Sequence, residues 1–168
     1  MSFRARSGVI AAATTAAAAM SFSFPTTASA ATVYSSDQCS SSGNSRCIML
    51  NYNSGNGGWL SACFLSNTEI PDYSGRYAGD GIQYSYVFNT HQIQYSLHYG
   101  TSGCWGGNGA DQPVKNNAAA VGNNLASCTA VIHYNSGYGG AQDKFSAGTN
   151  GNLNSTLKNE NASQSLIC

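Results

Sequence analysis

The residues of this chain best suited to chemistry are its six cysteines and three histidines. No Cys-x-x-Cys pair occurs, and even the nearest cysteines, Cys39 and Cys47, are well separated, which argues against a zinc site. In an oxidising environment we expect three disulfide bonds, for which the sequence alone permits fifteen pairings. The disulfide candidates are Cys39, Cys47, Cys63, Cys104, Cys128 and Cys168.

The histidines give little support to catalysis. His91, His98 and His133 belong to no HExxH motif, and the chain has no Gly-x-Ser-x-Gly elbow and no carboxylate pair at a recognisable spacing. Each histidine is more simply interpreted as a residue on a strand face. We therefore predict that the protein is not an enzyme.

The first thirty residues are typical of a secretory signal peptide. Arg4 and Arg6 precede an apolar stretch from Val9 to Met20, and Ala28-Ser29-Ala30 forms a cleavage box. This stretch is short and weakly apolar against the roughly 20 residues that cross a bilayer. The prediction is a signal peptide over 1–30, a single mature domain over 31–168, extracellular localisation and no membrane insertion.

The mature chain would be poor in charge. Without Arg4 and Arg6, five basic residues stand against seven acidic ones, a formal charge of about −2. A nucleic-acid partner is therefore not expected, because such binding needs a basic patch. Asn, Ser, Gly, Gln and Thr carry the solubility, and these are residues of turns and short β loops.

Two internal repeats organise the chain. Tyr52 to Gly58 reads YNSGNGG and Tyr134 to Gly140 reads YNSGYGG, and VKNNAAA at 114–120 is echoed by LKNENAS at 157–163. We expect unit one over 47–125 and unit two over 128–168. The extra length of unit one predicts an insertion over about 65–112, and two such units have sheet faces to bury against each other in a β-sandwich.

The insertion contains two period-two patterns. Apolar and polar residues alternate over Ile82 to Phe88 and again over Ile93 to Tyr99, which predicts two strands, and the four residues between them favour a β-hairpin. The tyrosine-rich face of this hairpin fits either a carbohydrate platform or, more commonly, core packing with hydroxyls at the rim.

These features together resemble the microbial βγ-crystallin-like proteins, and within them the secreted Streptomyces metalloproteinase inhibitor family. The likeness is strongest over Cys128 to Ile167, where AVIHYNSGYGGAQDKFSAG is followed by LKNENAS, and it extends to 47–58 and 111–124. The resemblance implies an all-β, βγ-crystallin-like Greek-key β-sandwich of two repeated units, with a β-hairpin insertion in the first unit.

The family's turn carries an aromatic, four residues, a second aromatic, one residue and a glycine with positive φ. Unit two has His133, Tyr138 and Gly140 at these places. Unit one has Asn51, Asn56 and Gly58, so only one of the four aromatic places is filled.

Calcium-binding members of the group carry two Asn or Asp residues followed, after two positions, by Ser or Thr and Ser. The matching places make Asn116, Asn159 and Ser163 weak calcium candidates, and calcium is the one possible cofactor. Ala120 and Val121 have no side-chain oxygen, and Gln164 carries an amide in place of the Ser hydroxyl. The alternative is that the asparagines cap turns through their side chains.

The resemblance also suggests a disulfide pattern. In a four-strand unit of this type the first and last strands lie side by side, which would bring Cys128 to Cys168. Cys39 to Cys47 resembles a short N-terminal loop of the inhibitor family, and Cys63 to Cys104 is then left to attach the insertion.

The function implied by the resemblance is inhibition of an extracellular protease, in particular a metalloprotease, by a monomeric protein. The family's reactive loop is described as a tight disulfide-bounded segment in the second half, which this chain lacks. Cys104 and Trp105, in the glycine-rich segment 100–109, are the substitute candidates for an inhibitory loop. The alternative is a calcium-, cell-surface- or polysaccharide-binding crystallin-like structural or toxin-like protein.

Overall fold

The computed structural model describes residues 31–39, 47–55, 61–79, 81–97, 100–104 and 106–168. Within these ranges the chain forms strands and turns and no helix, so the all-β prediction is confirmed. The predicted signal peptide, 1–30, lies outside the described residues.

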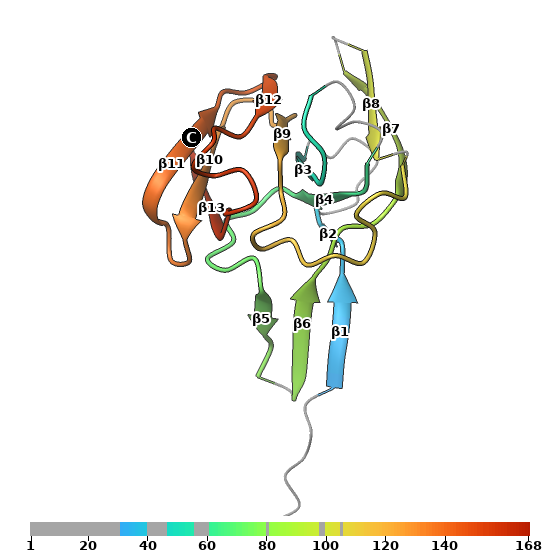
Figure 1. Cartoon of the computed structure of the whole chain (residues 1–168), viewed down its shortest axis with the longest axis vertical. Helices are drawn as coiled ribbons and strands as arrows, with labels where there is room; N and C mark the ends of the chain where they lie inside the picture. Colours follow the sequence, from blue (N-terminus) through green and yellow to red (C-terminus); the bar gives the residue numbers. More distant parts are fainter. Residues whose placement is uncertain (1–30, 40–46, 56–60, 80, 98–99, 105) are drawn as a thin grey trace, which may run out of the picture.

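The strands form four sheets (Figure 1). The central sheet has the order β12-β9-β3-β4-β2, and a second sheet has the order β11-β10-β13. The order β1-β6-β5 makes a third sheet, and β7 and β8 pair alone. The strands are β1 (Ala31–Ser35), β2 (Asp37–Gln38), β3 (Ile48–Asn51), β4 (Cys63–Ser66), β5 (Gly75–Tyr77), β6 (Ile82–Tyr86), β7 (His91–Leu97), β8 (Gly100–Cys104), β9 (Ala120–Asn123), β10 (Thr129–Asn135), β11 (Gly139–Phe145), β12 (Asn150–Asn152) and β13 (Ser163–Ile167).

The two sequence repeats pair their strands in the same register. In the first repeat, Ile48 of β3 lies opposite Asn123 of β9, and the ladder runs to Asn51 opposite Ala120. In the second repeat, Ala130 of β10 lies opposite Leu166 of β13, and the ladder runs to His133 opposite Ser163. Asn51 and His133 are thus equivalent, as their positions before the two YNSG segments require.

Each repeat also gives a segment to the sheet of the other. β12, from the second repeat, pairs antiparallel with β9 of the first. Ile70, from the first repeat, bridges Gln164 in β13 of the second. This exchange ties the two sheets into one folded unit.

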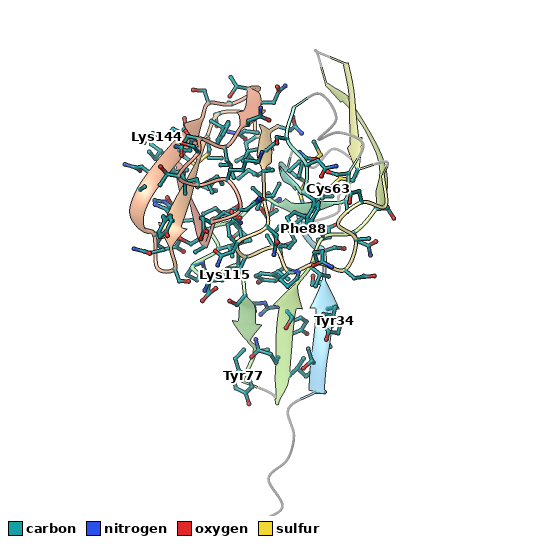
Figure 2. All side chains as sticks on the ribbon, viewed as in Figure 1. Tyr34, Cys63, Tyr77, Phe88, Lys115 and Lys144 are labelled. Atoms are coloured by element: carbon teal, nitrogen blue, oxygen red, sulfur yellow. A yellow bond between two sulfur atoms is a disulfide. The ribbon has the colours of Figure 1, made fainter. Side chains whose placement is uncertain are left out.

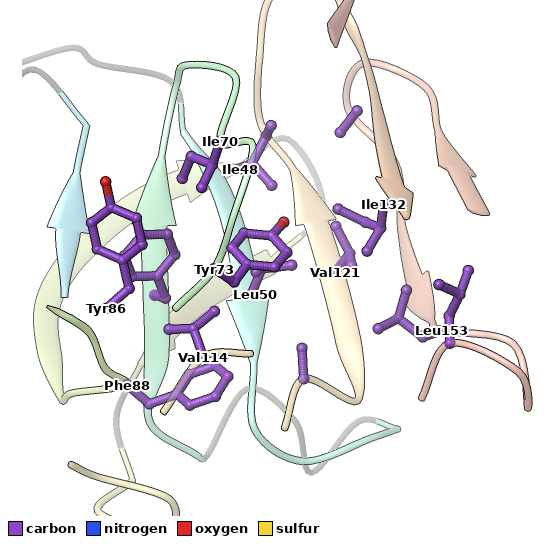
Figure 3. Packing of buried hydrophobic residues seen from close by; sticks show 14 of the residues in the cluster. Ile48, Leu50, Ile70, Tyr73, Tyr86, Phe88, Val114, Val121, Ile132 and Leu153 are labelled. Carbon is purple, nitrogen blue, oxygen red and sulfur yellow. The ribbon is translucent and has the colours of Figure 1, made fainter. Parts of the chain in front are cut away.

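The core lies between the central sheet and the β10 sheet (Figure 3). Leu50, Val121 and Ile132 are fully or almost fully buried there, and Tyr73 packs its ring edge-on against Phe64 with centroids 6.4 Å apart. A buried Tyr needs a partner for its hydroxyl. The Tyr73 hydroxyl donates to Gln164 Oε1 at 2.9 Å, which joins the two repeats inside the core.

The insertion contains strands, but their pairing differs from the predicted hairpin. β6 pairs with β1 and β5, whereas β7 pairs with β8. The chain between β6 and β7 places Phe88 in the core and bonds Asn89 to Cys63, so it passes through the body instead of turning back. The predicted pairing of 82–88 with 93–99 is therefore wrong, and the hairpin of the insertion is β7–β8.

The strands β1, β6 and β5 project from the body as a single layer (Figure 1). β1 and β6 run parallel in register from Ala31 opposite Ile82 to Ser35 opposite Tyr86. Most of this sheet is exposed or half-buried, since only Tyr86 at its upper end is buried.

Candidate functional site

The β7–β8 hairpin is clamped to the central sheet at one residue, Cys63. The Cys63 N–H donates to Asn89 O at 3.0 Å and the Asn89 N–H donates to Cys63 O at 2.9 Å, immediately before β7 begins. At the end of β8, Cys104 forms a disulfide bond with the same Cys63. Both strands of the hairpin are therefore fixed at their base, where His91 lies opposite Cys104.

The Cys63–Cys104 bond is buried in a small second cluster on the outer face of the central sheet. The Cys104 sulfur lies 3.6 Å from the Met49 sulfur. The cluster consists of Cys39, Cys47, Met49, Cys63, Leu65 and Cys104. Cys104, one of the two inhibitory-loop candidates, is thus buried and anchors the end of β8. Trp105, the other inhibitory-loop candidate, lies outside the described residues, and Gly107 beyond it is exposed.

The other two bonds also join the expected cysteines, Cys39 to Cys47 and Cys128 to Cys168. The second of these joins residues next to Thr129 and Ile167, which face each other on β10 and β13. All three disulfide bonds fit an oxidising environment outside the cell.

The two Lys-Asn turns are matched in conformation and bond to each other. Asn116 and Asn159 both have φ of 61°, a left-handed conformation that Asn tolerates better than most residues. The Asn116 N–H donates to Asn161 O, and the Asn159 N–H donates to Ala118 O, each at 2.8 Å. These residues are equivalent in the two repeats, so the turns meet across an approximate two-fold axis.

The calcium candidates are used by this turn architecture. Asn116 and Asn159 are exposed. The buried Ser163 hydroxyl donates to Asn135 O at 2.7 Å and accepts from the Tyr138 N–H at 3.1 Å. No cluster of three or more His, Cys, Asp or Glu side chains suited to a metal occurs among the described residues. Calcium binding at these positions stays a prediction.

The glycine turn of the second repeat has the geometry that its sequence pattern predicts. The rings of His133 and Tyr138 meet edge-on with centroids 5.9 Å apart, and Gly140 has φ of 79°. His133 Nε2 lies 2.8 Å from Ser165 Oγ. Burial of the imidazole lowers the pKa of His133.

The first repeat has Asn51 at the place of His133. Gly122 is equivalent to Ser165, so the hydroxyl that meets His133 has no counterpart here. The Asn51 side chain is fully buried, and its amide atoms have no hydrogen-bond partner among the described residues.

Lys115, in the Lys-Asn turn of the first repeat, forms an ion pair with Asp72 of the insertion and a hydrogen bond with Ser136 in the glycine turn of the second repeat. Lys115 Nζ lies 3.1 Å from Asp72 Oδ1 and 2.9 Å from Ser136 Oγ. Partial burial acts to raise the pKa of Asp72, but hydrogen bonds from Ser74, Lys115 and Ser136 outweigh this effect and hold the pKa below its usual value.

The symmetry-equivalent position, between the Lys-Asn turn of the second repeat and the glycine turn of the first, is a surface hollow of about 290 Å³. Lys158 corresponds to Lys115, and Ser54 corresponds to Ser136. Amide, hydroxyl and ammonium groups dominate the lining, which consists of Tyr52, Asn53, Ser54, Asn117, Ala119, Lys158 and Asn159. This hollow suits polar contacts at the surface.

The sequence predicts β6 as a strand but does not predict the projecting sheet. Val33, Tyr34 and Tyr77 are 41%, 70% and 61% exposed, which is high for large apolar side chains. The local indication of β1 is the run of β-forming residues Thr32-Val33-Tyr34. Its pairing with β6 has no local sequence pattern, because the two strands are far apart in the chain.

Comparison of the chain with protein-family models, curated proteins and solved structures finds no match. Among the described residues there is no helix long and apolar enough to cross a membrane.

Proposed function

We propose that this chain is a secreted, non-catalytic, βγ-crystallin-like protein that inhibits extracellular peptidases, with metallopeptidases as the first targets. The observation that carries the proposal is the clamp at Cys63. A binding element that is ordered before it meets its target loses less conformational freedom on binding, and this raises affinity.

The hairpin side of the insertion is the proposed inhibitory element. Its base is fixed by the Asn89 hydrogen bonds and by the Cys104 disulfide bond, and it lies at the opposite end of the molecule from the projecting sheet (Figure 1). A peptidase cleft could therefore receive this end without contact with β1, β5 or β6. The three disulfide bonds favour survival of such a protein among extracellular proteases.

The likeness to the βγ-crystallin group is supported by the matching registers of the two repeats and by the left-handed Asn116 and Asn159. The ring contact of His133 with Tyr138 supports it as well. These features concern the scaffold, and the hairpin is where this chain departs from a simple pair of repeats.

Titration of peptidases with the exported protein tests the proposal. We expect a thermolysin-like zinc endopeptidase to lose activity stoichiometrically, with subtilisin-like and papain-like enzymes as comparisons. Full activity of all three enzymes at micromolar protein would reject inhibition.

The two tryptophans provide a matched pair of variants. Trp105 follows the anchoring Cys104 in the sequence, whereas Trp59 follows the YNSGNGG segment of the first repeat. We expect Trp105→Ala to weaken inhibition at least tenfold and Trp59→Ala to leave it unchanged, with melting curves as the check on folding. Equal effects of the two changes would reject the assignment of Trp105 to the inhibitory loop.

A second candidate function, polysaccharide binding, is favoured by the exposed tyrosines of the projecting sheet. Tyr77 lies opposite Gln83, and Tyr34 opposite Ser85, so both rings share one face with uncharged hydrogen-bonding side chains (Figure 2). Aromatic faces beside such groups suit sugar rings. Cosedimentation with insoluble polysaccharides should fall in Tyr34→Ala/Tyr77→Ala and persist in Tyr134→Ala, and no cosedimentation of the unaltered protein would exclude this function.

A further inference from the structure

The projecting sheet has an open edge at β1. Among the described residues, β1 pairs with β6 and with no other strand. Such an edge offers a row of unsatisfied N–H and C=O groups to any other strand.

The backbone hydrogen bonds at the two ends of β1 show which groups face outward. The Ala31 N–H donates to Gly81 O at 3.1 Å, and Ser35 O accepts from the Val87 N–H at 3.0 Å. In a parallel ladder every second residue bonds to the neighbouring strand. Ala31, Val33 and Ser35 therefore direct their backbone groups to β6, whereas Thr32 and Tyr34 direct theirs to the open edge.

The β1 edge lacks the features that usually protect an edge strand. Its sequence, ATVYS, contains no charged residue and no proline. The side chains beside the edge include Val33 and Tyr34, which are large and exposed. The inference rests on export with removal of residues 1–30, which the signal-peptide pattern predicts.

We propose that two copies of this chain dimerise by antiparallel pairing of their β1 strands, with Val33 opposite the Val33 of the second copy. The outward-facing residues, Thr32 and Tyr34, lie symmetrically on either side of Val33. A two-fold axis at Val33 places each Thr32 opposite the Tyr34 of the other copy, so the two pairs exchange four backbone hydrogen bonds. The two three-stranded sheets become one six-stranded sheet.

Side chains support a second copy as the occupant. Val33 lies opposite Tyr84, and Tyr84 opposite Arg76, whose guanidinium lies 4.5 Å from the Tyr84 ring centroid. In the dimer the two Val33 side chains form a close non-hydrogen-bonded pair between the two Tyr84 rings. On the other face, Tyr34 meets Thr32 of the second copy, a pairing of two β-forming residues.

The interface is small, because β1 has five residues. Its area falls at the low end of specific protein interfaces, so the dimer should be weak and should dissociate on dilution. The pairing is independent of peptidase inhibition, because the hairpin lies at the other end of the molecule (Figure 1).

Sedimentation velocity of the exported protein, from micromolar to millimolar concentration, tests the pairing, with mass spectrometry to verify the first residue. We expect a monomer that converts to a dimer as concentration rises. A monomer throughout would overturn the proposal, and so would a monomer that captures only unrelated extended peptides.

Charge variants test the register. Val33→Lys and Val33→Glu each place like charges opposite each other, so either variant alone should dimerise at least about tenfold more weakly. A mixture of the two should recover dimer through the Lys–Glu pair. Thr32→Lys is the matched comparison, since Thr32 does not face itself, and it should weaken the dimer less than Val33→Lys does.

Two outcomes of the charge experiment would overturn the register. One is a mixture that dimerises no better than its components, and the other is a dimer that persists undiminished in both Val33 variants. Melting curves exclude misfolding as the cause of a lost dimer.

A cysteine pair tests the same contact by chemistry. In a non-hydrogen-bonded antiparallel pair the Cα atoms lie about 4.5 Å apart, within the range that disulfides span. Val33→Cys should therefore oxidise to a covalent dimer faster than Thr32→Cys, whose own copies lie farther apart. Equal rates of oxidation would contradict pairing centred on Val33.

Discussion

The two repeats have the same strand registers, yet their outer faces are treated differently. In the first repeat, β4 is buried on both faces, because the insertion and two disulfide bonds cover its outer side. In the second repeat, the equivalent strand β11 is largely exposed (Figure 2). The duplicated framework therefore folds in the second repeat with one face open, so the covered face of the first repeat is a feature added by the insertion.

The largest expected losses of unfolding free energy come from removal of the disulfide bonds. Cys63–Cys104 and Cys128–Cys168 span 41 and 40 residues, so their contributions through the unfolded chain should match, at about 2 to 4 kcal/mol each. Cys63 and Cys104 are also buried, whereas Cys168 is exposed. Replacement of the first pair by alanine should cost about 1 kcal/mol more, because it leaves a cavity.

Denaturant unfolding of Cys63→Ala/Cys104→Ala and Cys128→Ala/Cys168→Ala measures this difference. Equal losses of unfolding free energy would show that burial of the Cys63–Cys104 bond adds no stability beyond loop closure.

A second comparison uses one position in both repeats. Leu65 lies opposite Met49 in the first repeat, and Lys144 lies opposite the equivalent Val131 in the second. Leu65 is fully buried and Lys144 is exposed. Leu65→Ala should lower the unfolding free energy by about 2 to 5 kcal/mol, and Lys144→Ala by less than about 0.5 kcal/mol. A small effect of Leu65→Ala in chemical denaturation would mean that the insertion does not seal this face.

The repeats should also differ in their response to pH. The folded-state pKa of His133 is lowered by burial, so the unfolded chain takes up the proton more readily. The stability linked to His133 is complete above its unfolded pKa of about 6.5 and is lost as pH falls below that value toward the folded pKa.

His133→Asn introduces the residue that the first repeat carries at this place. The melting temperature of the unaltered protein should fall between pH 7.5 and pH 5, a window that avoids most carboxylate titration, and the fall should be smaller in His133→Asn. Identical pH profiles of the two proteins would assign the loss to other groups.

The smallest expected effect comes from the ion pair. Asp72 pairs with Lys115, and the Asp72 side chain is 38% exposed, so Asp72→Asn should cost about 0.2 to 1 kcal/mol and the cost should shrink in high salt. Lys158→Ala is the matched control at the equivalent lysine and should be near neutral. Thermal melting at two salt concentrations measures both losses. A larger loss for Lys158→Ala would show that Lys158 contributes more to stability than the Asp72–Lys115 ion pair.

The sequence allowed the all-β class and the cysteine pairs to be predicted, because both follow from repeated local patterns and from a resemblance that places strand ends together. It also predicted β6 as a strand. The partner of β6 could not be predicted, since alternation determines which face a strand buries and not which strand it joins. The parallel pairing of β1 with β6 joins residues far apart in the chain, and no turn motif predicts this pairing.

The candidate site could also be predicted only in part from the sequence. Positive φ at Asn116, Asn159 and Gly140 could be expected from residue type within the turns. The clamp at Cys63 could not be expected from the sequence, because it depends on Asn89, a residue that the predicted hairpin placed in a loop. Its hydrogen bonds appear only when the chain after β6 enters the body.

We propose that the covered side of the first repeat carries inhibition. Inhibition of a thermolysin-like endopeptidase should be measured with the two disulfide variants at a temperature where circular dichroism shows both to be folded. Cys63→Ala/Cys104→Ala should lose at least tenfold in affinity, because its hairpin is no longer held at both strands, whereas Cys128→Ala/Cys168→Ala should inhibit as the unaltered protein does. Undiminished inhibition by Cys63→Ala/Cys104→Ala would contradict the proposed role of the hairpin.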